Sequence, residues 1–121
     1  MQETYIEEIL KELTLEEKIG MIHGAGLFRT EGVERLSIPP LYMSDGPMGV
    51  RAEFADNEWR NVGTTEDYVT YLPCNSAIAS TWNRALAKKA GEVLGEEARG
   101  RGKDVILAPG INIKRSPLCG R

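Results

Sequence analysis

Asp45 is the first residue of this chain whose type and position could do chemistry. It follows the short apolar run of residues 41–43, which is long enough for one buried strand, and Gly46-Pro47 then force a turn. A carboxylate at the end of a buried strand can bind sugar hydroxyls or act in acid–base chemistry, and α/β proteins build their sites at this position. The alternative is an Asx-type turn, in which the Asp45 carboxylate bonds only its own backbone.

Arg115 and Arg51 are the candidate partners of Asp45. Arg115 lies a few residues past a second apolar run, residues 105–107, and is therefore expected on the same rim as Asp45. Arg51 follows Asp45 in the loop after the turn. A guanidinium donates several hydrogen bonds in a fixed geometry to hydroxyls or to a carboxylate. For both arginines the alternative is a surface side chain or one that is paired with an aspartate.

The loop of residues 52–71 offers a further possibility, a paired-carboxylate hydrolase site that includes Asp45. The candidate partners of Asp45 in this loop are Glu53, Asp56, Glu58 and Asp67. Spacing alone gives this little support, because acidic residues in a long loop are usually just solvated. The loop itself has no sustained period, and a segment of roughly twenty such residues is usually functional or disordered.

Helical patterns surround these candidates. Residues 3–12 predict a helix, because apolar residues recur at three- and four-residue spacing. Thr14 and Glu17 form a capping box that predicts the start of a second helix, and the glycines at 24 and 26 are expected to end it. Residues 83–99 predict a long amphipathic helix with one apolar face.

Two apolar runs predict the strands that carry the candidate residues, at 41–44 and 105–108. Residues 72–81 are consistent with a short buried strand or with a tight turn into a helix. Because a long helix separates the two predicted strands, the pattern indicates βα units in a parallel sheet. The predicted fold class is α/β, in one domain and without internal repeats.

Composition limits the function classes. The 121 residues are 41% hydrophobic and 27% charged, with a net charge of −3, so nothing favours nucleic acid or an anionic membrane as partner. No apolar run approaches the ~20 residues that span a bilayer. The acidic N-terminus lacks the features of a signal peptide, so we expect a cytoplasmic protein.

Cysteine and histidine are too few for a metal centre. Cys74 and Cys119 do not form a CxxC motif, and a disulfide framework is not expected. With His23 as the one histidine, neither a His cluster nor a Cys/His site has enough ligands. No metal or other cofactor is therefore expected.

A series of motifs, taken together and in order, resembles the N-terminal part of a family 3 glycoside hydrolase of the β-glucosidase-like group. The resemblance covers nearly the whole chain from residue 6 onward. The matching segments are residues 13–19, 34–39, the run Ser-Asp-Gly-Pro-Met-Gly-Val-Arg at 44–51, and residues 72–74, 79–83, 95–99 and 107–121.

The resemblance implies a fold and a set of site residues. The fold would be the first part of a (β/α)8 TIM-type barrel, incomplete and preceded by N-terminal helices, with residues 1–121 as a partial N-terminal barrel domain. The aspartate of the family's Asp-Gly-Pro motif binds sugar hydroxyls in the −1 subsite, which maps to Asp45. An arginine before Ser-Pro lines the same subsite, which maps to Arg115; the preceding residue is often His in the family and is Lys114 here. Arg51 joins them as a substrate-binding candidate.

The resemblance also implies what the chain lacks. The family's nucleophilic aspartate, its acid/base glutamate and a sugar-binding Lys-His pair come later in the sequence. The chain is therefore expected to be an inactive portion of a retaining β-glycosidase that hydrolyses terminal non-reducing sugars. Its expected partner is a saccharide or β-glycoside. The alternative is a stand-alone, non-enzymatic module that binds carbohydrate or protein through the 52–71 loop and the Asp45 rim.

Strands of an incomplete barrel also predict a second partner, another copy of the chain. A closed barrel has no sheet edges, whereas two or three of its strands leave two. Strands 41–44 and 105–108 would then expose apolar surface and unpaired backbone. We therefore expect the isolated chain to self-associate.

Overall fold

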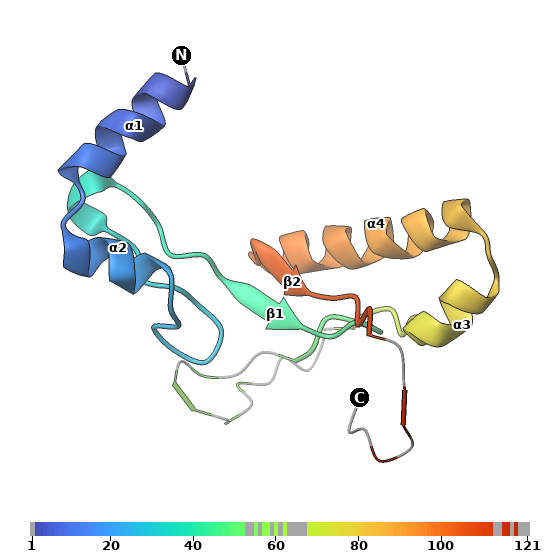
Figure 1. The fold of residues 1–121 in the computed structure, drawn as a ribbon. Helices are drawn as coiled ribbons and strands as arrows, with labels where there is room; N and C mark the ends of the chain where they lie inside the picture. Colours follow the sequence, from blue (N-terminus) through green and yellow to red (C-terminus); the bar gives the residue numbers. More distant parts are fainter. Residues whose placement is uncertain are drawn as a thin grey trace.

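A computed structural model describes residues 2–52, 55, 57–58, 60, 62, 68–112, 115–116 and 118. Within these residues, helices separate the two strands along the chain, as expected for a βα unit, and the sheet lies between the N-terminal helices and the long helix α4 (Figure 1). The elements are α1 Gln2–Glu12, α2 Leu15–Met21, the 3-10 helix η1 Glu34–Leu36, β1 Met43–Asp45, α3 Asn75–Ser80, α4 Arg84–Gly100 and β2 Val105–Leu107.

The capping box predicted at the start of α2 is confirmed. The Thr14 backbone N–H donates to Glu17 Oε2 at 2.8 Å, and the Glu17 backbone N–H donates to Thr14 Oγ1 at 3.2 Å. The predicted end of α2 was too late. The helix stops at Met21, before the glycines at 24 and 26, and the Ile22 N–H caps it by donating to the Ile19 carbonyl.

Arg35 ties this capping box to the η1 turn. Its Nε and Nη2 donate to the two carboxylate oxygens of Glu17 at 2.7 and 2.6 Å, and Nη2 also donates to the Glu12 carbonyl at 2.7 Å. This bidentate contact, together with the bond from the Thr14 amide, lowers the pKa of Glu17 from 4.5 to about 2. The N-terminal helices are thereby joined to the segment that leads into β1.

We predict an acid-sensitive contribution to stability from Glu17. Its pKa is lower in the folded chain than in the unfolded chain, so the stabilisation is complete above pH 4.5 and is lost as the pH falls toward about 2. The variant Glu17→Gln should therefore lose less melting temperature than the wild type between about pH 6 and about pH 3. Thermal unfolding followed by circular dichroism measures this difference.

Glu16→Gln is the matched control for this prediction. Glu16 lies on the same helical turn, is exposed, and makes no hydrogen bond or ion pair within the described part of the chain. Its variant should keep the pH dependence of the wild type. Equal pH dependence of Glu17→Gln and the wild type would contradict the role given to Glu17.

Strands β1 and β2 form a parallel pair, as predicted. Met43 is in register with Val105, Ser44 with Ile106, and Asp45 with Leu107. The predicted bounds of the first strand, 41–44, were shifted: Asp45 is itself the last residue of β1. Residues 41 and 42 contact the loop of residues 28–30, through a bridge between Arg29 and Tyr42 and a hydrogen bond from the Thr30 N–H to the Leu41 carbonyl, while the Tyr42 carbonyl also accepts from the Val105 N–H.

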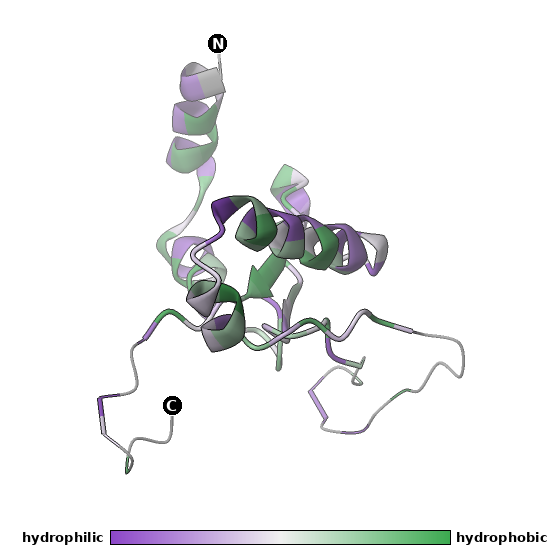
Figure 2. Ribbon diagram, turned by 90° about the vertical axis from the view of Figure 1, so that its right-hand side faces the viewer, coloured by the Kyte–Doolittle hydropathy of each residue, from purple (hydrophilic) through white to green (hydrophobic). Residues whose placement is uncertain are grey.

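The core lies between α4, β2 and the segments that follow β1. Its buried apolar side chains are Val50, Leu72, Leu94 and Ala98, with Ile106 packed against them. The helix predicted at 83–99 is confirmed as α4, capped by Asn83, whose Oδ1 accepts from the Leu86 amide at 3.1 Å. Figure 2 shows hydrophobic and hydrophilic residues recurring in turn along this helix.

The segment 72–81 takes the second of its two predicted forms, a turn into a short helix, α3. The α/β class and the parallel sheet are therefore confirmed, and the sheet has two strands within the described residues. None of the described helices is long and apolar enough to cross a membrane.

Candidate functional site

The candidate site is built on the turn that follows β1, residues 45–51. Gly46 takes a φ of +121°, and a Cβ at this position would overlap the carbonyl oxygen of Gly49. Only glycine fits this backbone without strain. The Gly49 N–H donates to the Gly46 carbonyl at 3.1 Å, so the turn closes tightly on itself. A closed turn of this kind brings Arg51 back beside Asp45.

Asp45 and Arg51 form an ion pair across this turn. The Arg51 Nε contacts Asp45 Oδ1, and both of these atoms are buried. The Arg51 guanidinium also lies over the Phe28 ring, 3.7 Å from its centroid, and its Nη1 donates to the Ala52 carbonyl at 3.0 Å. The arginine is therefore held by a charge, a ring and a carbonyl, and it fixes one carboxylate oxygen of Asp45.

The rest of the Asp45 carboxylate remains accessible. The Asp45 side chain is 47% exposed, compared with 19% for Arg51. Within the described residues the carboxylate accepts no hydrogen bond from the backbone of its own turn, so the Asx-type alternative is not what the structure shows. A carboxylate anchored at one oxygen and open to solvent can accept hydrogen bonds from the hydroxyls of a ligand.

Arg115 was predicted on the same rim. The parallel register places the carboxyl end of β2, at Leu107, beside Asp45, and Arg115 follows β2 along the chain. Arg115 is exposed, and no hydrogen bond or ion pair joins it to Asp45 within the described residues. Its role as a second sugar-binding residue stays a prediction.

The acidic residues of the 52–71 loop do not join Asp45 where the structure describes them. Glu58 forms an exposed ion pair with Arg60, with Oε2 and Nε 3.0 Å apart. Glu53, Asp56 and Asp67 lie outside the described residues, as do Lys114 and Cys119. Cys74 is an exposed free thiol, and no group of three or more His, Cys, Asp or Glu side chains gathers in the described residues to hold a metal ion.

The carboxyl end of α4 is hydrogen-bonded to residues 68–70, which lie against the turn of the candidate site. The sequence did not predict these contacts. Glu97 accepts three hydrogen bonds from Thr70, and Arg101 donates to the Tyr68 carbonyl at 2.8 Å. One signal for this was available: Glu97 lies three residues after Leu94 and beside Ala98, so the helical period places it at the edge of the buried face of α4.

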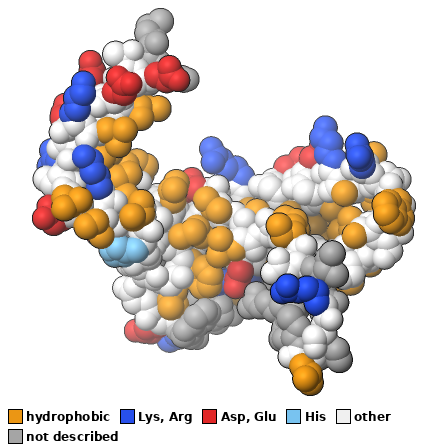
Figure 3. Space-filling model, viewed as in Figure 1, with side chains coloured by type: hydrophobic (Ala, Val, Ile, Leu, Met, Phe, Trp, Pro, Cys, Tyr) orange, Lys and Arg blue, Asp and Glu red, His pale blue; other side chains and the backbone are white. Residues whose placement is uncertain are grey.

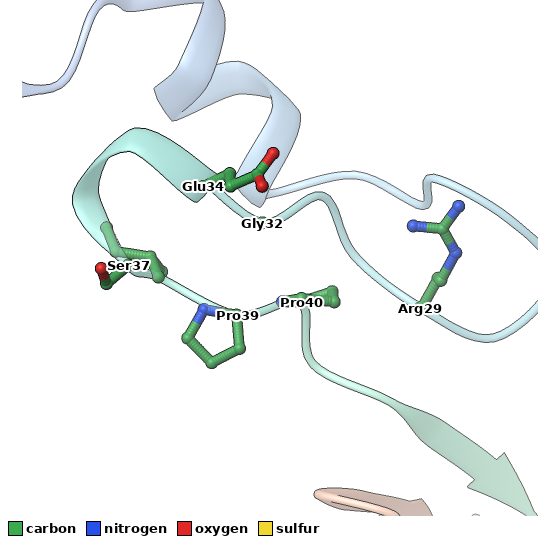
Figure 4. A pocket seen from close by; sticks show the side chains of 7 residues that line it. Arg29, Gly32, Glu34, Ser37, Pro39 and Pro40 are labelled. Carbon is green, nitrogen blue, oxygen red and sulfur yellow. The ribbon is translucent and has the colours of Figure 1, made fainter.

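Two hollows lie near the strand ends. The larger, of about 620 Å³, opens beyond the carboxyl ends of the strands between α3, α4 and residues 108–112, and Pro47 of the turn forms part of its wall. The other, of about 550 Å³, lies at the amino end of β1 and is lined by Arg29, Gly32, Glu34, Ser37 and residues 38–40 (Figure 4). Because Asp45 ends β1, the first of these two hollows adjoins the candidate site, through Pro47, among the residues that the structure describes.

Comparison with known proteins decides the family. Residues 9–121 match the model of the glycosyl hydrolase family 3 N-terminal domain. The chain belongs to glycosyl hydrolase family 3. This family 3 chain is 48% identical over 119 residues to β-glucosidase BoGH3A of Bacteroides ovatus, with 98% of this chain and 16% of that protein covered. It is 42% identical over 116 residues to thermostable β-glucosidase B of Acetivibrio thermocellus, with 96% and 15% covered.

Solved structures of β-glucosidases share the fold over the matched part of their chains. β-Glucosidase 3B from Thermotoga neapolitana, in complex with α-D-glucose, superposes with a TM-score of 0.79 at 38% identity. The match covers 97% of this chain and 18% of that one. The family 3 chain thus spans about one-sixth of the length of the curated relatives it matches.

Proposed function

We propose that this chain is the N-terminal portion of a retaining β-glycosidase of the β-glucosidase type, and that it supplies part of the −1 subsite. The proposal depends mainly on the geometry of Asp45, whose carboxylate lies at the end of β1. Arg51 contacts one of its oxygens, while nearly half of the side chain is exposed to solvent. The names of its relatives, all β-glucosidases, support the reaction class.

In this proposal Asp45 binds rather than reacts. Hydrogen bonds from sugar hydroxyls to an ionised carboxylate are charge-assisted and therefore strong. Arg51 keeps Asp45 oriented, and Arg115 adds a second group of donors from the segment after β2. A retaining mechanism needs two further carboxylates roughly 5–5.5 Å apart. We assign these to parts of the relatives' length that this chain does not span.

The proposed fold follows from the same reasoning. A (β/α)8 barrel typically has about 250 residues, and its site lies at the carboxyl ends of its strands. Strands β1 and β2 would be the first two strands of such a barrel, with α4 as a helix of its outer ring. The position of Asp45 at the carboxyl end of β1 agrees with this arrangement.

A chimera tests the proposed function. Residues 1–121 replace the matching segment of β-glucosidase 3B from Thermotoga neapolitana, and hydrolysis of 4-nitrophenyl β-D-glucoside is measured. We expect kcat/KM within about a hundredfold of the parent, a loss of roughly 2.7 kcal/mol in transition-state stabilisation. The 121-residue chain alone should give no turnover, since it lacks both reacting carboxylates.

The outcomes of this experiment distinguish the proposed function from the non-enzymatic alternative. A chimera that folds but does not hydrolyse the glucoside contradicts the proposed function, and so does a chimera that fails to fold in the parent's barrel. Turnover by the 121-residue chain that disappears in Asp45→Asn would overturn its inactivity. Sub-millimolar glucose binding by the chain alone would favour the non-enzymatic binding module, because part of one subsite should bind only weakly.

A further inference from the structure

We propose that Glu97 of α4 is a positioning residue for the 45–51 turn, acting through Thr70. The inference rests on the proposed function, because it assumes that the turn binds a sugar. It adds to that function a residue that does not itself touch the sugar. The structural basis is a continuous series of contacts from α4, through residues 68–72, to the turn.

The first contacts join Glu97 to Thr70. The Thr70 backbone N–H donates to both carboxylate oxygens of Glu97, at 3.1 and 3.0 Å, and the Thr70 hydroxyl donates to Oε1 at 2.6 Å. Hydrogen bonds to an ionised carboxylate are about twice as strong as neutral ones. Glu97 therefore fixes both the backbone and the side chain of Thr70.

Arg101, the C-cap residue that follows α4, holds the same segment. Its Nη2 donates to the Tyr68 carbonyl at 2.8 Å, and its Nη1 donates to the Glu97 carbonyl at 3.3 Å. Residues 68–70 are thus hydrogen-bonded at two points, to Glu97 of α4 and to the C-cap residue of this helix. These residues lie at the end of the 52–71 loop, and they belong to no helix or strand.

The second set of contacts joins this segment to the turn. The Leu72 N–H donates to the Met48 carbonyl at 2.7 Å, and the Gly49 backbone approaches so closely that a Cβ there would lie 2.8 Å from the Thr70 carbonyl oxygen. Val50, only 1% exposed, packs in the same core cluster as Leu72. A displacement of Thr70 would therefore push on the Gly49 backbone, within the turn that brings Arg51 to Asp45.

Glu97 is not needed to hold α4 itself. Leu94 and Ala98 bury the inner face of this helix against the core. The carboxylate of Glu97 bonds instead to a segment outside the helix. Its loss should thus loosen the 68–72 segment and the turn, while α4 remains docked.

A double-mutant cycle in the chimera tests this role. Glu97→Ala is expected to lower kcat/KM by about tenfold, because a displaced binding group weakens the contacts it makes in the transition state. In the Asp45→Asn background the same change should cost less than about threefold, because the group that Glu97 positions is already impaired. Glu97→Gln, which keeps one acceptor oxygen, should recover part of the loss.

Control variants separate positioning from general stability. Glu96→Ala changes the neighbouring exposed carboxylate, which makes no hydrogen bond or ion pair within the described residues, and should leave kcat/KM within about twofold. If Glu97→Ala fails to fold, the milder variants Thr70→Val and Thr70→Ser test the same contact from the Thr70 side. Thr70→Val removes the hydroxyl and should lower kcat/KM, whereas Thr70→Ser should retain it.

Two results would overturn the inference alone. One is an active chimera in which Glu97→Ala has no effect, and the other is a loss of the same size with and without the Asp45→Asn substitution. A chimera without activity before any substitution overturns the proposed function instead, and the inference falls with it. The two failures are therefore distinguishable.

Discussion

Asp45→Asn is expected to lower kcat/KM of the chimera for 4-nitrophenyl β-D-glucoside by about a hundredfold or more. Each hydrogen bond from a sugar hydroxyl to the charged carboxylate contributes roughly 1.5–3 kcal/mol, and tenfold in rate corresponds to about 1.4 kcal/mol. The substitution also removes the charge that faces the Arg51 guanidinium, so the remaining arginine is left beside a neutral amide. Both effects weaken sugar binding at the same point.

Glu58→Gln is the matched control for this variant. It makes the same change from carboxylate to amide and also breaks an ion pair with an arginine, but both side chains of that pair are exposed. An exposed ion pair contributes at most about 1 kcal/mol to stability. We therefore expect kcat/KM to stay within about threefold of the chimera. An Asp45→Asn chimera that folds and keeps kcat/KM within threefold would contradict the assigned role of Asp45.

The second prediction concerns the chain by itself, which we expect to self-associate at tens of micromolar. Within the described residues β2 pairs only with β1, and its outer edge carries no further strand. Leu107 on this strand is 48% exposed, and Figure 3 shows hydrophobic side chains on the surface along α1 and over the sheet. An open strand edge beside apolar surface is a template for pairing with another chain. Light scattering after size exclusion should give a mass above 13.4 kDa.

A charge on the strand tests where the copies meet. Leu107→Lys should weaken self-association by about tenfold or more, because charged side chains on edge strands oppose pairing. Leu15→Lys adds the same charge at an exposed position of α2, and it should leave the association unchanged. A clean monomer of the wild-type chain at these concentrations would contradict the prediction.

The elements that sequence predicts well are those set by local patterns. The capping box of Thr14 and Glu17 and the long helix α4 depend on neighbours a few residues apart, and both are confirmed. The parallel pairing of β1 and β2 follows from the helix between them. The exact bounds of β1 cannot be predicted in this way. Pairing with Leu107 extends the strand to Asp45, and residues 28–30 hydrogen-bond to the residues just before its first position.

Long-range polar contacts are what sequence alone does not reveal. Arg35 and Glu17 are 18 positions apart, and Glu97 and Thr70 are 27 positions apart. Neither spacing belongs to a helix or a hairpin, so no periodicity indicates that these residues meet. The same is true of the Phe28 ring beneath Arg51, which depends on how the 28–30 loop pairs with the start of the strand.

The candidate site combines a residue that the sequence predicts with contacts that it does not reveal. Asp45 is predictable, because an apolar run followed by Gly-Pro places a carboxylate at a strand end. The structure decides between the alternatives that the sequence left open for Arg51 and Asp45. Arg51 is paired with an aspartate, which is Asp45 itself, and no Asx-type turn forms in the described residues. Arg115 follows β2, and its neighbours in the part of the chain that the structure describes belong to no strand or helix, so its place in the site still rests on the family resemblance.

A crystal structure of the chimera with bound glucose tests directly whether Asp45 binds the sugar. We expect a carboxylate oxygen of Asp45 to lie about 2.5–3.0 Å from a glucose hydroxyl oxygen, as in an O–H···O hydrogen bond, while Arg51 still contacts the other oxygen. Glucose bound in the barrel with every hydroxyl more than about 4 Å from the Asp45 carboxylate would contradict it.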